Sequence, residues 1–166
     1  MKNIVLCGFM GCGKSTVGRR LAAQLDMQFI DMDTYIEEQE GRTISDIFAK
    51  DGEAAFRAIE HDACVTLGQT AGLVIATGGG AVLRDDNVDA LSANGVIIFL
   101  DVNEASVLER LKNDTTRPLL QRPDKEQAVH ELMSKRAPLY ARASHLTVDA
   151  NGDAETVCEA VRNALR

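Results

Sequence analysis

The stretch at 8–16, GFMGCGKST, constrains the fold of this chain more than any other. It matches the pattern GxxxxGK[ST], and it lies between an apolar run, NIVLC, and a segment in which apolar residues recur every fourth position. In this setting the glycines let backbone N–H groups turn inward, and the following helix adds its positive N-terminal end. The stretch therefore predicts a nucleotide-phosphate site, with Lys14 directed to the outer phosphates and Ser15 to Mg²⁺.

The rest of the chain alternates between apolar runs and helical patterns. The runs are nearly continuous, as expected for strands that are covered on both faces. Such alternation favours right-handed crossovers and a parallel sheet of about five strands with helices on both sides, an α/β three-layer sandwich. In such a sheet, ligands bind beyond the carboxyl ends of the strands. The expected strands are residues 3–7, 28–31, 72–77, 95–101 and 145–149.

Two segments depart from this alternation. Residues 34–69 are expected to form a long helical insertion, interrupted near Gly41 and Gly52, that provides a substrate-binding platform. Residues 112–125 are polar, hold two of the three prolines and are expected to form a mobile lid. Because 166 residues supply enough apolar material for one core, we expect residues 1–166 to form a single domain.

Composition limits the expected partners. The formal net charge is −7, so no overall basic field favours nucleic acid or an anionic membrane, and neither is expected as a partner. Twelve of the 18 cationic residues are arginines, which are suited to bidentate contacts with carboxylates and phosphates. The four cysteines form no CxxC pair and the three histidines no HxxxH spacing, so neither a zinc site nor a disulfide framework is indicated. No apolar run resembles a signal peptide or a membrane span, and we expect a cytoplasmic protein.

Three classes of protein use this kind of phosphate-binding loop: small-molecule kinases, GTPase switches, and motor or regulatory ATPases. A GTPase should carry an NKxD element, which the sequence lacks, and a DxxG match at 149–152 follows the last expected strand instead of a central one. A motor or large regulatory ATPase generally needs more chain for its force-transmitting or oligomerising parts. The sequence therefore favours a small-molecule kinase.

An acidic pair follows the second expected strand. Asp31 and Asp33 are two residues apart, so in an extended segment both carboxylates would share a face and project toward the phosphate loop. One would support hydrated Mg²⁺, while the other would accept a hydrogen bond, and later a proton, from a substrate hydroxyl. Two alternatives stay open. Asp33 caps a helix while Asp31 is solvated, or Asp101, which also ends a buried strand, provides the metal carboxylate.

The third expected strand runs into the triglycine segment TGGG at 77–80. Three glycines expose consecutive backbone N–H groups and let a ligand approach the main chain closely, which indicates a second ligand site, with a tight turn as the alternative. Arg57 and Arg136 lie in expected helices and are candidates for clamping a carboxylate. Spacing alone does not establish that these two arginines converge.

Together these motifs resemble the shikimate kinase family over essentially the whole chain. They are GFMGCGKSTVGR, the DxD pair, ISDIF with DGEAAFR, ATGGGAV, TRPLL and KRAPLY, in this order. The resemblance implies ATP-dependent phosphorylation of the 3-hydroxyl of shikimate in aromatic amino-acid biosynthesis, with Mg²⁺ as cofactor. It also implies a fold like that of nucleoside monophosphate kinases, with strand order 2-3-1-4-5. We expect a monomeric kinase that closes its lid over the substrates.

The resemblance also assigns roles to residues. The nucleotide contacts it implies are Gly11, Cys12, Gly13, Lys14, Ser15, Thr16, Arg110 and Arg117. The acceptor contacts it implies are Asp33, Phe48, Arg57, Phe56, Gly79, Gly80 and Arg136. Ser15 would bind Mg²⁺ directly and Asp31 through water. Lys14, Asp33 and Arg117 would be catalytic, with Asp33 as the favoured base and Arg117 closing onto the phosphates from the lid.

The sequence departs from the family pattern in two places. Met32 stands between the two aspartates where the family usually has Ser or Thr, and its side chain is expected to point away from the site. The loop at 149–155 lacks the arginine that often lies near the adenine, so adenine selectivity is less firmly implied than phosphate binding. The alternatives in the kinase class are a gluconate-type kinase and a nucleoside monophosphate kinase. The alternative outside it is an ATP-binding regulatory module without catalysis.

Overall fold

A five-stranded parallel sheet forms the centre of the protein in the computed structural model, which describes residues 2–112 and 124–166. Its strand order is β2-β3-β1-β4-β5, which confirms the order implied by the resemblance. All four neighbouring pairs are parallel. The strands are β1 (Asn3–Cys7), β2 (Gln28–Asp31), β3 (Leu73–Ala76), β4 (Gly95–Asp101) and β5 (Leu146–Asp149).

The sheet is buried where the sequence predicted continuous apolar runs. Every residue of β1 and β3 is buried, because each strand lies between two others and is covered on both faces. The register pairs Ile4 with Val74 on one side and with Val96 on the other, so branched apolar side chains stack across the middle of the sheet. This rigid centre brings the carboxyl ends of the strands to one edge, where ligands bind in such folds.

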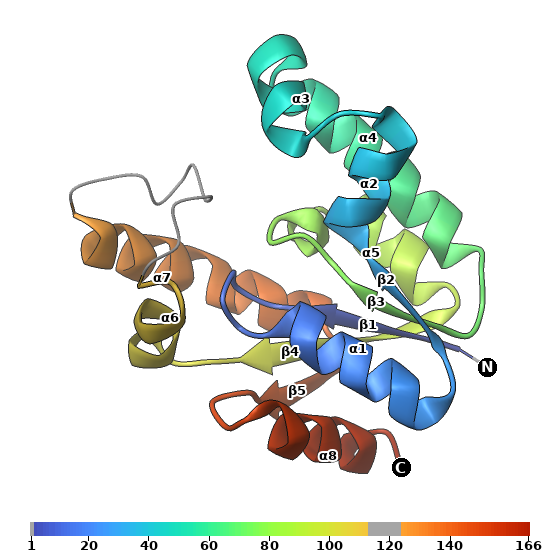
Figure 1. Cartoon of the computed structure of the whole chain (residues 1–166), viewed down its shortest axis with the longest axis vertical. Helices are drawn as coiled ribbons and strands as arrows, with labels where there is room; N and C mark the ends of the chain where they lie inside the picture. Colours follow the sequence, from blue (N-terminus) through green and yellow to red (C-terminus); the bar gives the residue numbers. More distant parts are fainter. Residues whose placement is uncertain (1, 113–123) are drawn as a thin grey trace.

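Helices cover both faces of the sheet and complete the predicted three layers (Figure 1). On one face, α1 (Lys14–Leu25) packs against α8 (Ala154–Ala164). On the other face, α5 (Asp85–Ser92) and α7 (Lys125–Ala143) contact β4. The close approach of α1 to β2 depends on Gly18, because a Cβ there would lie 2.5 Å from the ring of Phe29.

The predicted insertion at 34–69 is helical, as expected, and consists of three helices. These are α2 (Met32–Glu40), α3 (Ile44–Asp51) and α4 (Glu53–Gly68). Gly41 and Gly52 separate them with φ values of 67° and 88°, which L side chains rarely adopt. Since α4 also packs against α5, the insertion is joined to the body of the domain, while α3 projects from it (Figure 1).

The remaining helices flank two loops. The short helix η1 (Ala81–Leu83) follows the triglycine segment. Helix α6 (Glu104–Arg110) precedes the segment that the sequence predicts as a lid, and α7 follows it. Residues 113–123 of that segment, including Arg117, lie outside the described residues, so the lid prediction stays a prediction.

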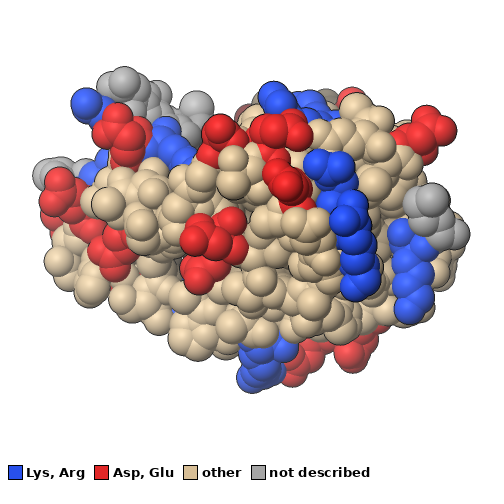
Figure 2. Space-filling model, turned by 90° about the horizontal axis from the view of Figure 1, so that it is seen from below, with Lys and Arg blue, Asp and Glu red and all other residues tan. Residues whose placement is uncertain are grey.

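The described part of the chain carries buried cysteines and charged surface side chains of both signs. Within 2–112 and 124–166, no helix is long and apolar enough to cross a membrane. All four cysteines are free and buried, and no group of metal-ligating residues of the His, Cys, Asp and Glu type is found in the described ranges. On the face shown in Figure 2, acidic and basic side chains are interspersed and do not gather into one basic surface.

Candidate active site

The phosphate loop leaves β1 and curls before α1 begins at Lys14. Its curl depends on Gly8, Gly11 and Gly13, whose φ values are 148°, 81° and 91°. L side chains rarely adopt this backbone region, which explains the glycines in the motif. The N–H of Cys12 donates to the Phe9 carbonyl oxygen (3.1 Å) and closes the loop internally.

Lys14 lies inside the loop. Its Nζ donates to the carbonyl oxygens of Gly8 (2.8 Å) and Phe9 (3.3 Å), and it lies 3.7 Å from Sγ of Cys12. The ammonium group of Lys14 is thus held within the loop by two neutral carbonyl oxygens. A polyphosphate is a stronger acceptor than a carbonyl, so the arrangement leaves Lys14 ready to exchange partners.

Ser15 and Asp31 meet beside the loop. Ser15 Oγ donates to Asp31 Oδ2 over 2.6 Å, while Asp31 Oδ1 accepts from the backbone N–H of Thr34 (3.2 Å) and caps α2. The expectation of an extended DxD segment was wrong, because β2 ends at Asp31 and α2 begins at Met32. The cap is Asp31 and not Asp33, because the chain turns into the helix two residues earlier than the alternative assumed.

Asp33 lies in the first turn of α2 and faces the triglycine segment. A Cβ built on Gly78 would lie 2.8 Å from Asp33 Oδ1, so only glycine permits this approach. Met32 points elsewhere, as expected from the sequence. It is fully buried, with its sulfur 4.0 Å from Sγ of Cys64. The helical turn therefore separates a buried apolar residue from the two carboxylates on either side of it.

Arg57 and Arg136 converge, which the sequence had left open. A Cβ on Gly80 would lie 2.6 Å from Nη1 of Arg57, and a Cβ on Gly79 would lie 3.4 Å from Nη1 of Arg136. Helix α4 supplies the first arginine and α7 the second, and both guanidinium groups reach the same triglycine segment. This segment therefore lies between two cations that are 79 residues apart in sequence (136 − 57 = 79).

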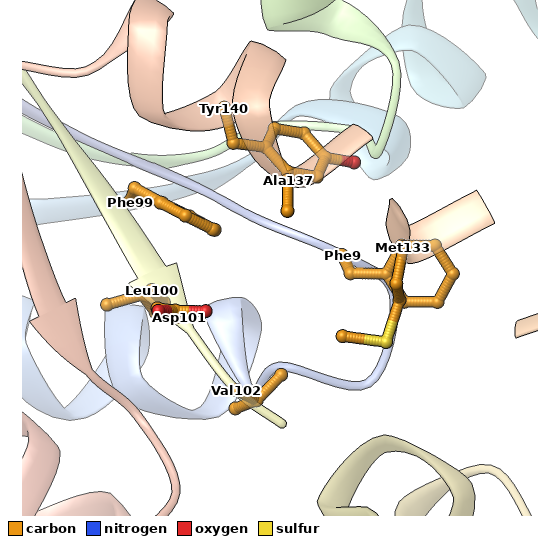
Figure 3. Close-up of a pocket in the computed structure, with 8 residues that line it drawn as sticks. All are labelled: Phe9, Phe99, Leu100, Asp101, Val102, Met133, Ala137 and Tyr140. Atoms are coloured by element: carbon orange, nitrogen blue, oxygen red, sulfur yellow. The ribbon is translucent and has the colours of Figure 1, made fainter. Parts of the chain in front are cut away.

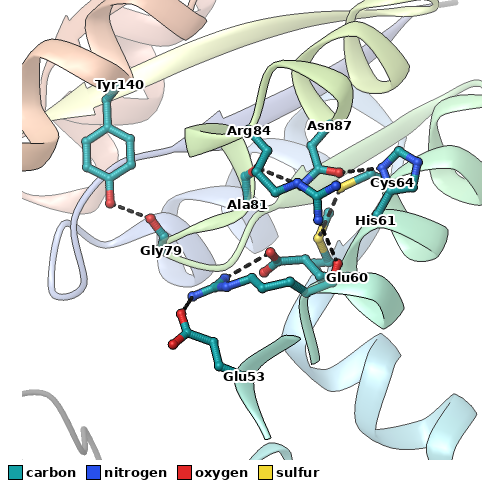
Figure 4. Close-up of polar contacts among 11 residues, drawn as sticks. Glu53, Glu60, His61, Cys64, Gly79, Ala81, Arg84, Asn87 and Tyr140 are labelled. Atoms are coloured by element: carbon teal, nitrogen blue, oxygen red, sulfur yellow. Dashed lines mark hydrogen bonds and ion pairs between the residues drawn. The ribbon is translucent and has the colours of Figure 1, made fainter. Parts of the chain in front are cut away.

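Glu60 holds Arg57 in place, and sequence reasoning missed it. Arg57 Nη1 donates to Glu60 Oε1 (2.9 Å), and Glu53 lies 3.6 Å from Nη2 (Figure 4). Burial of Glu60, whose side chain is 1% exposed, raises the pKa of its carboxyl group, while the positive charge of Arg57 lowers that pKa. The i,i+3 spacing of the two residues in a predicted helix was the signal available in the sequence.

Two phenylalanines extend the acceptor side toward solvent. The rings of Phe48 and Phe56 are tilted, with centroids 4.9 Å apart, and the Arg57 guanidinium lies 5.3 Å from the Phe56 ring centroid. Phe56 is buried, whereas Phe48 is 39% exposed and is the one exposed large hydrophobic side chain in the described residues. The Phe56 ring thus lies beside Arg57 with Phe48 next to it, and their role as a pocket wall stays a prediction.

Arg110 joins the phosphate loop to the loop after β5. Its Nη1 donates to the Gly11 carbonyl oxygen (3.0 Å), and its Nη2 donates to the carbonyl oxygens of Ala150 (3.0 Å) and Gly152 (3.5 Å). The planar guanidinium group thus links the phosphate loop to the loop after β5. The contact with adenine that the resemblance implies stays a prediction.

Asp101 was the alternative to Asp31 as the carboxylate that supports the metal ion. It is exposed at the end of β4 and lines a different pocket, whereas Ser15 hydrogen-bonds Asp31. The pocket lies between β4 and α7, with Phe9 of the phosphate loop at its side (Figure 3). Its other lining residues are Phe99, Leu100, Val102, Met133, Ala137 and Tyr140. The geometry favours Asp31 as the partner of Ser15.

Comparison with known proteins finds relatives over most of the chain. The family model described as shikimate kinase matches residues 10–166. A shikimate kinase from Thermodesulfovibrio yellowstonii is 47% identical over 152 residues, covering 92% of this chain and 87% of that protein. The solved structure of a shikimate kinase from Acinetobacter baumannii in complex with shikimate has a TM-score of 0.94 and 38% identity, and the match covers 99% of this chain and 93% of that one.

A more distant likeness separates fold from family. A gluconokinase from Sinorhizobium meliloti matches 99% of this chain and 94% of its own with a TM-score of 0.53, but with only 18% identity. That likeness shows a shared fold alone. The family model and the relatives above, which span most of the chain at much higher identity, decide the assignment. This chain belongs to the shikimate kinase family.

Proposed function

We propose that this protein transfers the γ-phosphoryl group of ATP to the 3-hydroxyl of shikimate and divides that task between two sides of one site. The observation that supports this proposal best is the convergence of Arg57 and Arg136 on Gly79 and Gly80. Two guanidinium groups around exposed backbone amides form a receptor for a carboxylated ring. The other side is the phosphate loop.

The phosphate side binds and orients ATP. The backbone amides of the loop, from Gly11 to Thr16, surround the phosphates, and Lys14 leaves its carbonyl partners to reach the transferring group. Arg110 lies against the adenine, and Arg117 contributes from the lid when residues 112–125 close. Positioning and charge stabilisation are what phosphoryl transfer requires most, because the protein forms no covalent bond to the phosphoryl group.

Ser15 and Asp31 fit a Mg²⁺ site. Their oxygens lie 2.6 Å apart, and hard oxygen donors beside a phosphate loop are the ligands that Mg²⁺ prefers. Ser15 would hold the ion directly and Asp31 through water. When bound, Mg²⁺ would neutralise charge on the phosphate oxygens.

The acceptor side orients the 3-hydroxyl of shikimate toward the phosphate side. Arg57 and Arg136 pair with the carboxylate of shikimate, while the N–H groups of Gly79 and Gly80 meet its ring. Phe48 and Phe56 form the wall. Asp33 accepts a hydrogen bond from the 3-hydroxyl and takes its proton as the oxygen attacks phosphorus. All of these groups come from a single chain, which is consistent with a monomer.

The reaction is tested by measuring ADP release with three acceptors: shikimate, gluconate and a nucleoside monophosphate. We expect turnover with shikimate only, and phosphorus–proton NMR of the product should couple the phosphorus to the proton on carbon 3. Turnover with gluconate or with the nucleoside monophosphate would contradict the proposal, because it would show that the protein has another acceptor specificity. ATP binding without any transfer would support the regulatory module.

The carboxylate clamp is tested by Arg136→Ala. Leaving the carboxylate without one charged partner costs about 2 to 5 kcal/mol, so we expect the KM for shikimate to rise at least about 30-fold while the KM for ATP is unchanged. Arg142→Ala is the matched control, because Arg142 lies on the same helix, is 68% exposed and pairs with Asp85 at the surface. If only the KM for ATP changed, the clamp would be assigned wrongly.

A further inference from the structure

The hydroxyl of Tyr140 reaches the triglycine segment. Its O–H donates to the carbonyl oxygen of Gly79 (Figure 4). Tyr140 belongs to α7 and is 1% exposed, whereas Gly79 is half-buried, so the hydroxyl group makes this hydrogen bond from the interior of the protein. A hydrogen bond in such surroundings fixes the two groups relative to each other more firmly than a surface contact does.

The ring of Tyr140 is anchored to the central sheet. It packs against Phe99 of β4 with ring centroids 5.5 Å apart and planes tilted by 37°. It also lines the pocket between β4 and α7, where Ala137 and Phe9 lie around it (Figure 3). Because the ring packs against the sheet, the position of the hydroxyl group relative to Gly79 is fixed.

Arg136 lies one helical turn before Tyr140, and the two side chains meet at the same glycine. A Cβ on Gly79 would lie 3.4 Å from Nη1 of Arg136 and 3.9 Å from the hydroxyl of Tyr140. Burial raises the pKa of Tyr140 to about 12, although the positive charge of Arg136 lowers it. The phenol therefore stays protonated at neutral pH and remains a donor to the Gly79 carbonyl.

The two arginines are thus held by different means. Arg57 is fixed by the carboxylates of Glu60 and Glu53. Beside Arg136, by contrast, lies a neutral phenol that also binds the main chain of the triglycine segment. A neutral phenol does not compensate the positive charge of Arg136, and its bond to Gly79 sets the distance between that charge and the backbone amides.

We propose that Tyr140 is a positioning residue of the acceptor site. It fixes the position of Gly79 relative to Arg136, so that the amide group of Gly79 and the guanidinium group of Arg136 contact the same ligand. This inference rests on the proposed placement of the shikimate carboxylate beside Arg136. Tyr140 touches neither substrate. Its contribution reaches the acceptor through Gly79 and Arg136, and it should not affect ATP.

Tyr140→Phe removes only the hydroxyl and keeps the ring on Phe99. One internal hydrogen bond is worth about 0.5 to 1.5 kcal/mol, so we expect the KM for shikimate to rise about 3- to 10-fold, with the KM for ATP and kcat within about 2-fold of the parent. Tyr35→Phe is the control, because Tyr35 is the only other tyrosine and is half-buried in α2. The melting temperature of both variants is measured alongside.

A double-mutant cycle with Arg136→Ala separates positioning from general packing. In the Arg136→Ala background, we expect Tyr140→Phe to change the KM for shikimate by less than about 2-fold, because its route to the ligand is gone. The same fold-change in both backgrounds would overturn the inference, as would an unchanged KM in the single variant. A parallel rise in the KM for ATP with a lowered melting temperature would also overturn it, since this outcome indicates a purely structural role.

The cycle also distinguishes failure of the inference from failure of the proposed site. If Arg136→Ala raises the KM for shikimate and Tyr140→Phe does not, the site stands and the positioning role is wrong. If Arg136→Ala itself leaves that KM unchanged, the carboxylate is bound elsewhere and both proposals are wrong.

Discussion

The phosphate side and the acceptor side of this site are built in different ways. The main part of the phosphate side is the phosphate loop, one continuous stretch from Gly8 to Thr16 in which the sequence motif and the three-dimensional site are nearly the same. The acceptor side is assembled from α2, α3, α4, the triglycine segment and α7, which are far apart in the sequence. A site within one continuous stretch can be recognised from its sequence motif, whereas the recognition of a site assembled from distant segments depends on the fold that brings those segments together.

The two sides also use charge differently. In the phosphate loop, one ammonium group is held by neutral carbonyl oxygens, and backbone amides supply the rest of the positive field. On the acceptor side, the guanidinium of Arg57 is paired with a buried carboxylate, Glu60. Changes in the phosphate loop should therefore affect the transfer step most, and changes in the two arginines or the triglycine segment should affect shikimate binding most.

The largest effect is expected from Lys14→Ala. Because Lys14 is the only side-chain cation within the loop stretch at 8–16, its loss should lower kcat about 10²- to 10³-fold, the usual cost of one preorganised donor to developing charge. Steady-state assays of ADP release measure it, with Lys50→Ala at an exposed position of α3 as the control. A rise in the KM for shikimate without a loss of kcat would contradict this division of roles.

The next largest effect is expected from Asp33→Asn, which sits where the two sides meet. The amide keeps the shape of the side chain but cannot take a proton, so kcat should fall at least about 100-fold. Calorimetry should find ATP affinity unchanged. Asp62→Asn, at an exposed position of α4, is the control. Turnover equal to the parent's would remove Asp33 from the mechanism.

The smallest effect is expected from Gly80→Ala. The backbone of Gly80 has φ −106° and ψ −3°, which alanine adopts without strain, so only the new methyl group matters. That methyl would lie 2.6 Å from Nη1 of Arg57 and must displace the guanidinium group. We expect the KM for shikimate to rise about 10-fold, a loss of the size of one charged hydrogen bond, with the KM for ATP and the melting temperature unchanged. An equal rise in the KM for ATP would break the separation of the two sides.

The sequence predicted the fold well because its signals are periodic and local. Continuous apolar runs gave all five strands, and Gly41 and Gly52 marked the breaks in the helical insertion. One detail was not accessible to it. The exact end of β2 decides whether Asp31 or Asp33 caps α2, and strand ends depend on tertiary packing as much as on propensity.

The acceptor side was predicted as a set of residues but not as an arrangement. Pattern identified Arg57, Arg136 and the triglycine segment, yet their convergence depends on how α4 and α7 pack against the sheet. Glu60 and Tyr140 were missed for a related reason. Each acts on a residue that touches the proposed ligand. The i,i+3 spacing of Arg57 and Glu60 was a signal in the sequence, whereas a phenol within a helix carries no local mark of that role.

The most direct test of the account is a crystal structure of the protein with shikimate and a non-hydrolysable ATP analogue. It should place the shikimate carboxylate within hydrogen-bonding distance of both Arg57 and Arg136, with the 3-hydroxyl between Asp33 and the terminal phosphate. A carboxylate bound away from those two arginines, or a 3-hydroxyl turned away from the phosphate loop, would contradict it.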